Sequence, residues 1–168
     1  FSLSRGLGDV YKRQINDQYK ELFDHEKWKK FNSEDFKYRS CSTCTDKFGM
    51  KLLREKNYKL SILSNGTPSL LDELVNRNNL NDIFDDIMSV EEVGIFKPSS
   101  KVYDMPIKKY NIKEKEVAFL SANTWDVSGG GNYGFNAIWV NRNNAIFDNL
   151  DYTPKNEINN LKQLLDIV

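Results

Sequence analysis

The 168-residue sequence contains a single histidine, His25, and only two cysteines, Cys41 and Cys44. The cysteines form a C-x-x-C pair, a pattern typical of a redox pair or of half of a zinc site. A zinc site needs two further ligands, and one histidine cannot supply both. A redox pair belongs at a helix start after a strand, whereas the residues before Cys41 form only a weak strand pattern. We therefore interpret both cysteines as reduced thiols without a metal.

The sequence also lacks an excess of charge and a long hydrophobic segment. Lysine plus arginine and aspartate plus glutamate each number 24, so the formal net charge is zero. This balance does not suggest a nucleic acid or an anionic membrane as partner. No apolar run is long enough to span a bilayer, and residues 1–14 contain no apolar segment of signal-peptide length. We therefore expect a cytoplasmic protein.

The remaining pattern is an alternation of strands and helices within the length of one domain. We predict strands over residues 58–65, 83–90, 116–122 and 136–142. We predict helices over residues 15–31, 46–57, 67–78, 99–110, 124–134 and 156–168. Thr67 and Pro68 are suited to the start of the third helix, and Pro106 should disturb the fourth. This order predicts an α/β fold with a parallel, doubly wound sheet.

Polar residues lie at the ends of two of the predicted strands. Ser64-Asn65-Gly66 lies at the end of the first strand, and Ser121-Ala122-Asn123 lies at the end of the third. Ligands of open α/β sheets bind outside the carboxyl ends of the strands. The sequence therefore places both segments at one crevice.

Four stretches together resemble the L-2-haloacid dehalogenases, metal-independent members of the haloacid dehalogenase superfamily. These stretches are ILSNGTP (62–68), GIFKPSSKVY (94–103), SANTWDVSGGGNYGF (121–135) and the segment that begins with IWVNR at 138. The resemblance covers residues 45–168 and keeps the spacing of the family motifs. It implies a haloacid dehalogenase-like Rossmannoid parallel sheet with flanking helices.

Ala122 bears on the question of a metal. Phosphatases of this superfamily carry an acid four residues before the position of Asp126, and the two acids help to hold magnesium. Hard cations require several oxygen ligands. Alanine cannot supply one, so the resemblance implies an enzyme without a metal or another cofactor.

The resemblance also implies a reaction and its substrate contacts. In the family, an aspartate displaces halide from a 2-haloacid, and water then hydrolyses the aspartyl ester. An (S)-2-haloacid thus becomes an (R)-2-hydroxyacid. Ser64 would bind the substrate carboxylate beside a helix N-terminus, Asn65 would cradle the departing halide, and Trp125 would form a wall of the site.

Five further residues take catalytic roles by the same resemblance. Lys97 would neutralise and hold the nucleophilic aspartate. Asp126 would position or activate the water. Ser121 and Asn123 would orient the carboxylates by hydrogen bonds, and Tyr103 would support the charge network.

Each of these residues, taken alone, also has a structural explanation. Lys97 would be an exposed loop lysine, Tyr103 an ordinary core residue, and Asp126 an acid that complements a helix dipole. Their joint spacing favours the functional interpretation. We interpret Gly129–Gly131 as a site of tight packing rather than of phosphate binding, because the order of a phosphate-binding loop is absent.

The first motif of the family has only a weak counterpart in this sequence. In the family, an apolar strand ends in D-x-Y-G-T-L and carries the nucleophile, whereas Asp9-Val10-Tyr11 here follows no apolar run. We predict that residues 1–14 are a non-native leader, 15–44 the remnant of a helical cap, and 45–168 the core domain. The first strand and most of the cap would then be missing, and the chain as given would be an inactive fragment.

Two other functions remain open from the sequence. One is a magnesium-dependent phosphatase of the same superfamily, against which Ala122 argues. The other is a non-catalytic domain that binds a small carboxylate or a partner protein. The expected partners of the leading interpretation are a small 2-haloacid and water. A homodimer is left open, because members of the family often form dimers.

Overall fold

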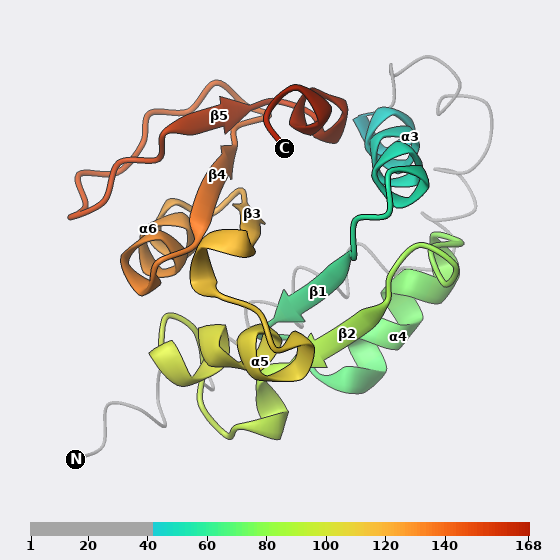
Figure 1. The fold of residues 1–168 in the computed structure, drawn as a ribbon, viewed down its shortest axis with the longest axis horizontal. Coiled ribbons are helices and arrows are strands. Elements are labelled where there is room, and N and C mark those ends of the chain that lie inside the picture. Colours follow the sequence, from blue (N-terminus) through green and yellow to red (C-terminus); the bar gives the residue numbers. More distant parts are fainter. Residues whose placement is uncertain (1–41) are drawn as a thin grey trace, which may run out of the picture. The chain divides into compact units, whose positions relative to one another are not determined.

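The computed structural model describes residues 42–168, with side chains from Asp46 onward. The predictions for the leader, the cap remnant, Asp9 and the cysteine side chains lie outside this part of the chain. The elements in order are α3 (Ser42–Glu55), β1 (Ser61–Ser64), α4 (Pro68–Arg77), β2 (Asp86–Ser89), α5 (Ser100–Tyr110), β3 (Ala118–Ser121), α6 (Thr124–Tyr133), β4 (Asn136–Val140) and β5 (Asn156–Ile158) (Figure 1). Short 3-10 helices follow β2 (η2, Val90–Glu92), precede β3 (η3, Glu114–Glu116) and follow β5 (η4, Leu161–Asp166).

The strands form two parallel sheets in the described part of the chain. One sheet pairs β1 with β2, and the other has the order β3-β4-β5. In the first sheet Ser64 lies opposite Ser89, so both strands end on serine. The α/β class and the parallel strands are confirmed. β1 and β3 are not hydrogen-bonded to each other, so the single continuous sheet expected from the strand order is divided between them.

Apolar packing joins the two sheets where backbone pairing does not. Leu63 of β1 packs against the buried cluster of Tyr103, Phe119 and Phe135, to which β3 contributes Phe119. A second cluster, made of Leu53, Ile138, Val140, Ile158 and Leu164, is contacted by Leu60 and Leu120. β1 with the residue before it, and β3, therefore pack against the same two apolar clusters.

Local sequence signals explain where helix α4 begins and ends. Thr67 is the N-cap residue, and its hydroxyl accepts a hydrogen bond from Leu70 N–H. Pro68 occupies the first turn, where its missing N–H costs nothing. After the helix, Asn79 adopts a left-handed backbone conformation (φ 52°) that asparagine tolerates. No helix between residues 42 and 168 is long and apolar enough to cross a membrane.

Two details of the predicted helices are wrong. Helix α5 runs through the buried Pro106 to Tyr110 without an interruption. The predicted closing helix over residues 156–168 is instead β5 followed by η4. The cause is tertiary: Ile158 is buried beside Val140 in the second sheet, which outweighs the helical spacing of Leu161, Leu164 and Leu165.

Candidate active site

A buried ion pair lies beyond the ends of the strands. The ammonium Nζ of Lys97 is 2.7 Å from Oδ2 of Asp126, and the two side chains are 9% and 3% exposed. Lys97 lies in the loop between η2 and α5, whereas Asp126 lies in the first turn of α6. The alternative of an exposed loop lysine is therefore wrong, because Lys97 is buried against an acid.

Tyr103 completes the hydrogen bonding of this carboxylate. Its hydroxyl donates to Oδ1 of Asp126 at 3.0 Å, and the tyrosine itself is fully buried. Burial raises the pKa of Tyr103 well above its usual range, and the neighbouring negative charge of Asp126 adds to this effect. The phenol of Tyr103 therefore stays neutral and keeps the proton that it donates to the carboxylate of Asp126.

Lys97 also ties the ion pair to the end of β1. Its Nζ donates to the carbonyl oxygen of Leu63 at 3.1 Å, and its backbone N–H donates to Oδ1 of Asn65 at 3.0 Å. The ammonium further lies 5.5 Å from the centre of the Phe119 ring, within the range of a cation–π interaction. Because the side-chain oxygen of Asn65 accepts this hydrogen bond, its side-chain NH₂ group remains available to donate another.

Ser64, the last residue of β1, is fixed by the loop that follows it. Its Oγ accepts a hydrogen bond from Gly66 N–H at 3.0 Å. The hydroxyl proton of Ser64 has no acceptor among the described residues. Ser64 is thus arranged as a donor, which is the property required to bind a carboxylate.

Ser121 and Asn123 are near the site in sequence but do not bond to the ion pair. Ser121 ends β3, and its Oγ accepts a hydrogen bond from Asn123 N–H at 3.2 Å. Asn123 is the N-cap residue of α6, is exposed, and forms no side-chain cap hydrogen bond. Among the described residues neither side chain hydrogen-bonds to the side chain of Lys97 or Asp126, so their predicted role in orienting carboxylates stays a prediction.

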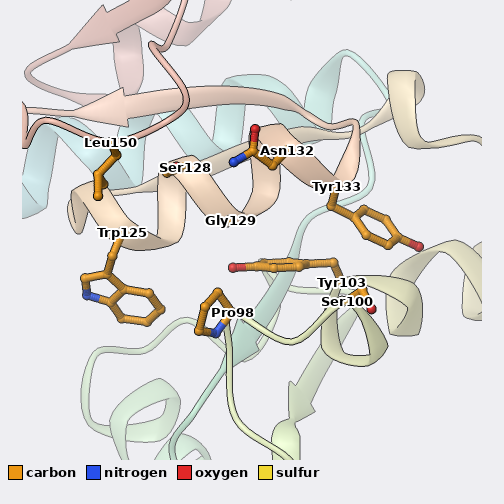
Figure 2. Close-up of a pocket in the computed structure, with 9 residues that line it drawn as sticks. All are labelled: Pro98, Ser100, Tyr103, Trp125, Ser128, Gly129, Asn132, Tyr133 and Leu150. Atoms are coloured by element: carbon orange, nitrogen blue, oxygen red, sulfur yellow. The ribbon is translucent and has the colours of Figure 1, made fainter.

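Trp125 lines an open cavity between α5 and α6 (Figure 2). The cavity has a volume of about 620 Å³, and Trp125 and Leu150 lie at one end, with Tyr133 and Ser100 at the other. Tyr103 also lines it, but Lys97 and Asp126 do not. The cavity therefore borders the charge network through Tyr103 alone.

The three consecutive glycines of α6 allow side chains to approach its backbone. A Cβ atom on Gly129 would lie 2.4 Å from the hydroxyl of Tyr103, and one on Gly130 would lie 2.6 Å from the Phe119 ring. A Cβ atom on Gly131 would lie 2.2 Å from the ring of Tyr152. Figure 2 shows Tyr103 and Pro98 facing α6 at Gly129. The prediction of tight packing at the glycines is confirmed.

Three groups that contact Lys97 or the loop after β1 were missed by sequence reasoning. They are the carbonyl oxygen of Leu63, the ring of Phe119, and the hydroxyl of Ser89 at the end of β2, which donates to Gly66 C=O. No sequence signal identifies a backbone carbonyl or a ring as a partner of Lys97. Ser89 carried the same signal as Ser64, a polar residue that ends a predicted parallel strand.

The donor set of the described residues offers little to a cation. Both oxygens of Asp126 are engaged, one by Lys97 and the other by Tyr103. Between residues 46 and 168 no three histidine, cysteine or acidic side chains gather at one point. Among the described residues, the side-chain partners of Asp126 are therefore an ammonium group and a phenol rather than further acids.

Comparison with known proteins identifies relatives of this chain. A (S)-2-haloacid dehalogenase of Pseudomonas putida is 36% identical over 115 residues, which are 68% of this chain and 51% of that protein. A crystal structure of an L-2-haloacid dehalogenase matches with a TM-score of 0.69 and 30% identity, over 71% of this chain and 53% of the other. The enzyme of Xanthobacter autotrophicus, solved with chloropropionic acid covalently bound, matches with a TM-score of 0.64 and 26% identity, over 71% of this chain and 58% of that one.

These comparisons establish the family. The chain spans about half the length of the curated relatives it matches. The family model for haloacid dehalogenase-like hydrolases matches residues 7–140, a range that includes every residue of the charge network and of the Ser64 loop. This chain therefore belongs to the haloacid dehalogenase-like hydrolase family.

Proposed function

We propose that the described residues are part of the active site of a (S)-2-haloacid dehalogenase that works without a metal. The enzyme would convert (S)-2-haloacids to (R)-2-hydroxyacids through an aspartyl ester. The observation that carries this proposal is the buried Lys97–Asp126 pair, bonded to both Tyr103 and the end of β1. We further propose that residues 45–168 are the core domain of this enzyme.

The first step requires a carboxylate nucleophile that remains charged. An ammonium group has three N–H donors, and Lys97 uses one on Leu63 C=O and one on Asp126. The third donor is left for the nucleophilic aspartate, whose oxygen attacks C2 of the haloacid. The carbon–halogen bond breaks, the halide leaves with its electron pair, and an ester bond forms.

Ser64 and Asn65 supply the groups that hold the substrate during this step. The hydroxyl proton of Ser64 donates to the substrate carboxylate, close to the N-terminus of α4, where partial positive charge favours an anion. The NH₂ group of Asn65 donates to the departing halide, because its carbonyl oxygen is held by Lys97 N–H.

The second step is hydrolysis of the ester, and Asp126 orients the water. The ionised carboxylate only accepts hydrogen bonds, so a water that donates to it directs a lone pair toward the ester carbonyl. Attack by this water breaks the acyl–oxygen bond, one proton of the water passes to the hydroxyl oxygen of the departing hydroxyacid, and the other is released to solvent as the aspartate carboxylate is regenerated. Tyr103 and Lys97 hold Asp126 in place throughout.

Ligand binding tests the part of the site that the structure describes. The ¹⁵N-labelled chain is titrated with (R)-lactate, the product expected from (S)-2-chloropropionate, and with lactamide as the uncharged control. We expect lactate, but not lactamide, to shift the amide resonances of Ser64, Asn65 and Gly66. Equal shifts with both compounds would contradict recognition of a carboxylate.

Turnover tests the reaction. The sequence upstream of this coding region is recovered, and a product with an apolar strand ending in D-x-Y-G-T is assayed for halide release from (S)-2-chloropropionate. We expect release without added metal, with Asp126→Asn slower by about 10²–10⁴-fold, whereas the 168-residue chain itself should release little halide. Magnesium-dependent hydrolysis of p-nitrophenyl phosphate in place of halide release would instead favour a phosphatase.

A further inference from the structure

A buried serine at the end of β2 contacts the loop that follows β1. Ser89 is 2% exposed, and its Oγ donates to the carbonyl oxygen of Gly66 at 2.8 Å. The same oxygen accepts a hydrogen bond from Glu91 N–H at 3.2 Å. Ser89 lies opposite Ser64 in the register of the two strands. The Ser89 hydroxyl therefore acts as both donor and acceptor, and it donates to the loop that follows β1.

Gly66 links the two serines through its backbone. Its N–H donates to Ser64 Oγ at 3.0 Å, and its C=O accepts from Ser89. The residue is therefore held at both of its polar groups. A shift of the Gly66 carbonyl away from Ser89 would carry the Gly66 N–H with it and loosen the bond that orients the Ser64 hydroxyl.

We propose that Ser89 is a positioning residue for anion binding, which acts through Gly66 to hold the Ser64 hydroxyl as a donor. The inference rests on the proposed role of Ser64 as the ligand of the substrate carboxylate. Ser89 itself does not touch the substrate. The hydrogen bond from its hydroxyl restricts the conformation of the Gly66 loop before the ligand binds, and this lowers the entropic cost of binding.

Ser89 also has a structural role that the test must separate from positioning. Because its Oγ accepts from Glu91 N–H, it is the N-cap of the short helix η2. Loss of this cap would lower the overall stability of the protein. It would not by itself weaken the affinity for a carboxylate or loosen the Gly66 N–H.

Threonine and valine provide a matched pair of substitutions. Both add the same volume at Ser89 and suit a strand end, but only threonine keeps the hydroxyl. We expect Ser89→Val to raise the Kd for (R)-lactate about tenfold, the equivalent of one ordinary hydrogen bond. Ser89→Thr should stay within about twofold of the unmodified chain. If Ser89→Val does not fold, Ser89→Ala takes its place.

A second measurement does not depend on the ligand. Hydrogen exchange of the Gly66 amide, followed by NMR without lactate, reports the bond to Ser64 directly. We expect exchange to be about tenfold faster in Ser89→Val and unchanged in Ser89→Thr. Thermal unfolding of the same variants measures the contribution of the η2 cap separately.

The outcomes separate the two proposals. If the unmodified chain binds lactate and Ser89→Val binds it equally well, Ser89 is not a positioning residue. If the unmodified chain does not bind lactate, the role proposed for Ser64 fails, and the exchange measurement alone decides on Ser89. Exchange that is faster in Ser89→Val but not in Ser89→Thr then supports the link through Gly66, and equal exchange in both variants overturns it.

Discussion

Replacing Lys97 by methionine tests the energetic meaning of the buried ion pair. Methionine keeps the length and apolar stem of lysine but has no charge and no donor. Asp126 is 2% exposed, and among the described residues its side chain would keep only the hydroxyl of Tyr103 as a partner. The substitution therefore leaves an uncompensated carboxylate in the interior.

The cost follows from this uncompensated charge. Breaking a buried ion pair by removing one partner typically costs about 3–5 kcal/mol. Loss of the bond from Lys97 to Leu63 C=O adds to this figure. We therefore expect Lys97→Met to lower the free energy of unfolding at neutral pH by at least about 3 kcal/mol, a large part of the total stability of a typical domain.

Urea unfolding at neutral pH measures this cost, with Lys97→Met/Asp126→Asn as the companion variant. Because the double variant leaves no charge at the position of this pair, it should recover part of the lost stability, with a coupling energy of about 2 kcal/mol or more. A deficit below about 1 kcal/mol for Lys97→Met, the level of an exposed ion pair, would refute the reasoning.

Three further substitutions test other features of the structure. Gly129→Ala should lower the free energy of unfolding by about 1–3 kcal/mol, because its Cβ would meet the Tyr103 hydroxyl; an unchanged Tm would contradict this contact. Above about pH 10, Tyr103 should cost the protein about 1.4 kcal/mol of stability per pH unit, because the unfolded phenol ionises there while the buried one, whose pKa is raised, does not. Tyr103→Phe should remove this contribution, and urea unfolding between pH 9 and pH 11 measures the change in slope. Asp46→Ala removes the acceptor of Leu161 N–H (2.7 Å) and of Arg142 (2.6 Å), so protease cleavage within residues 159–168 should accelerate, and equal cleavage rates would count against the contact.

The elements of the fold were largely predictable because local signals and burial agree. The strand patterns over 116–122 and 136–142 became β3 and β4 with only their ends trimmed. The segment 156–168 failed because its fate depends on pairing with β4, a contact distant in sequence. The division into two sheets does not follow from strand order, which says which strands exist but not which edges pair.

The site was predictable only as a set of positions. Motif spacing correctly brought Lys97, Tyr103 and Asp126 together, and these three residues form one hydrogen-bonded network. Spacing could not indicate that the hydroxyl of Ser121 would accept a hydrogen bond from Asn123 N–H. Which hydrogen bonds form depends on differences of a few ångströms in backbone geometry, and a sequence pattern does not specify these differences.

The glycines of α6 have a consequence for the order of assembly. Each glycine costs a helix about 1 kcal/mol relative to alanine, so a peptide spanning Thr124–Tyr133 should not be helical by itself. Its helix becomes favourable only when the rings of Tyr103, Phe119 and Tyr152 come to rest on it. The position of the acid in its first turn therefore depends on contacts from three separate parts of the chain.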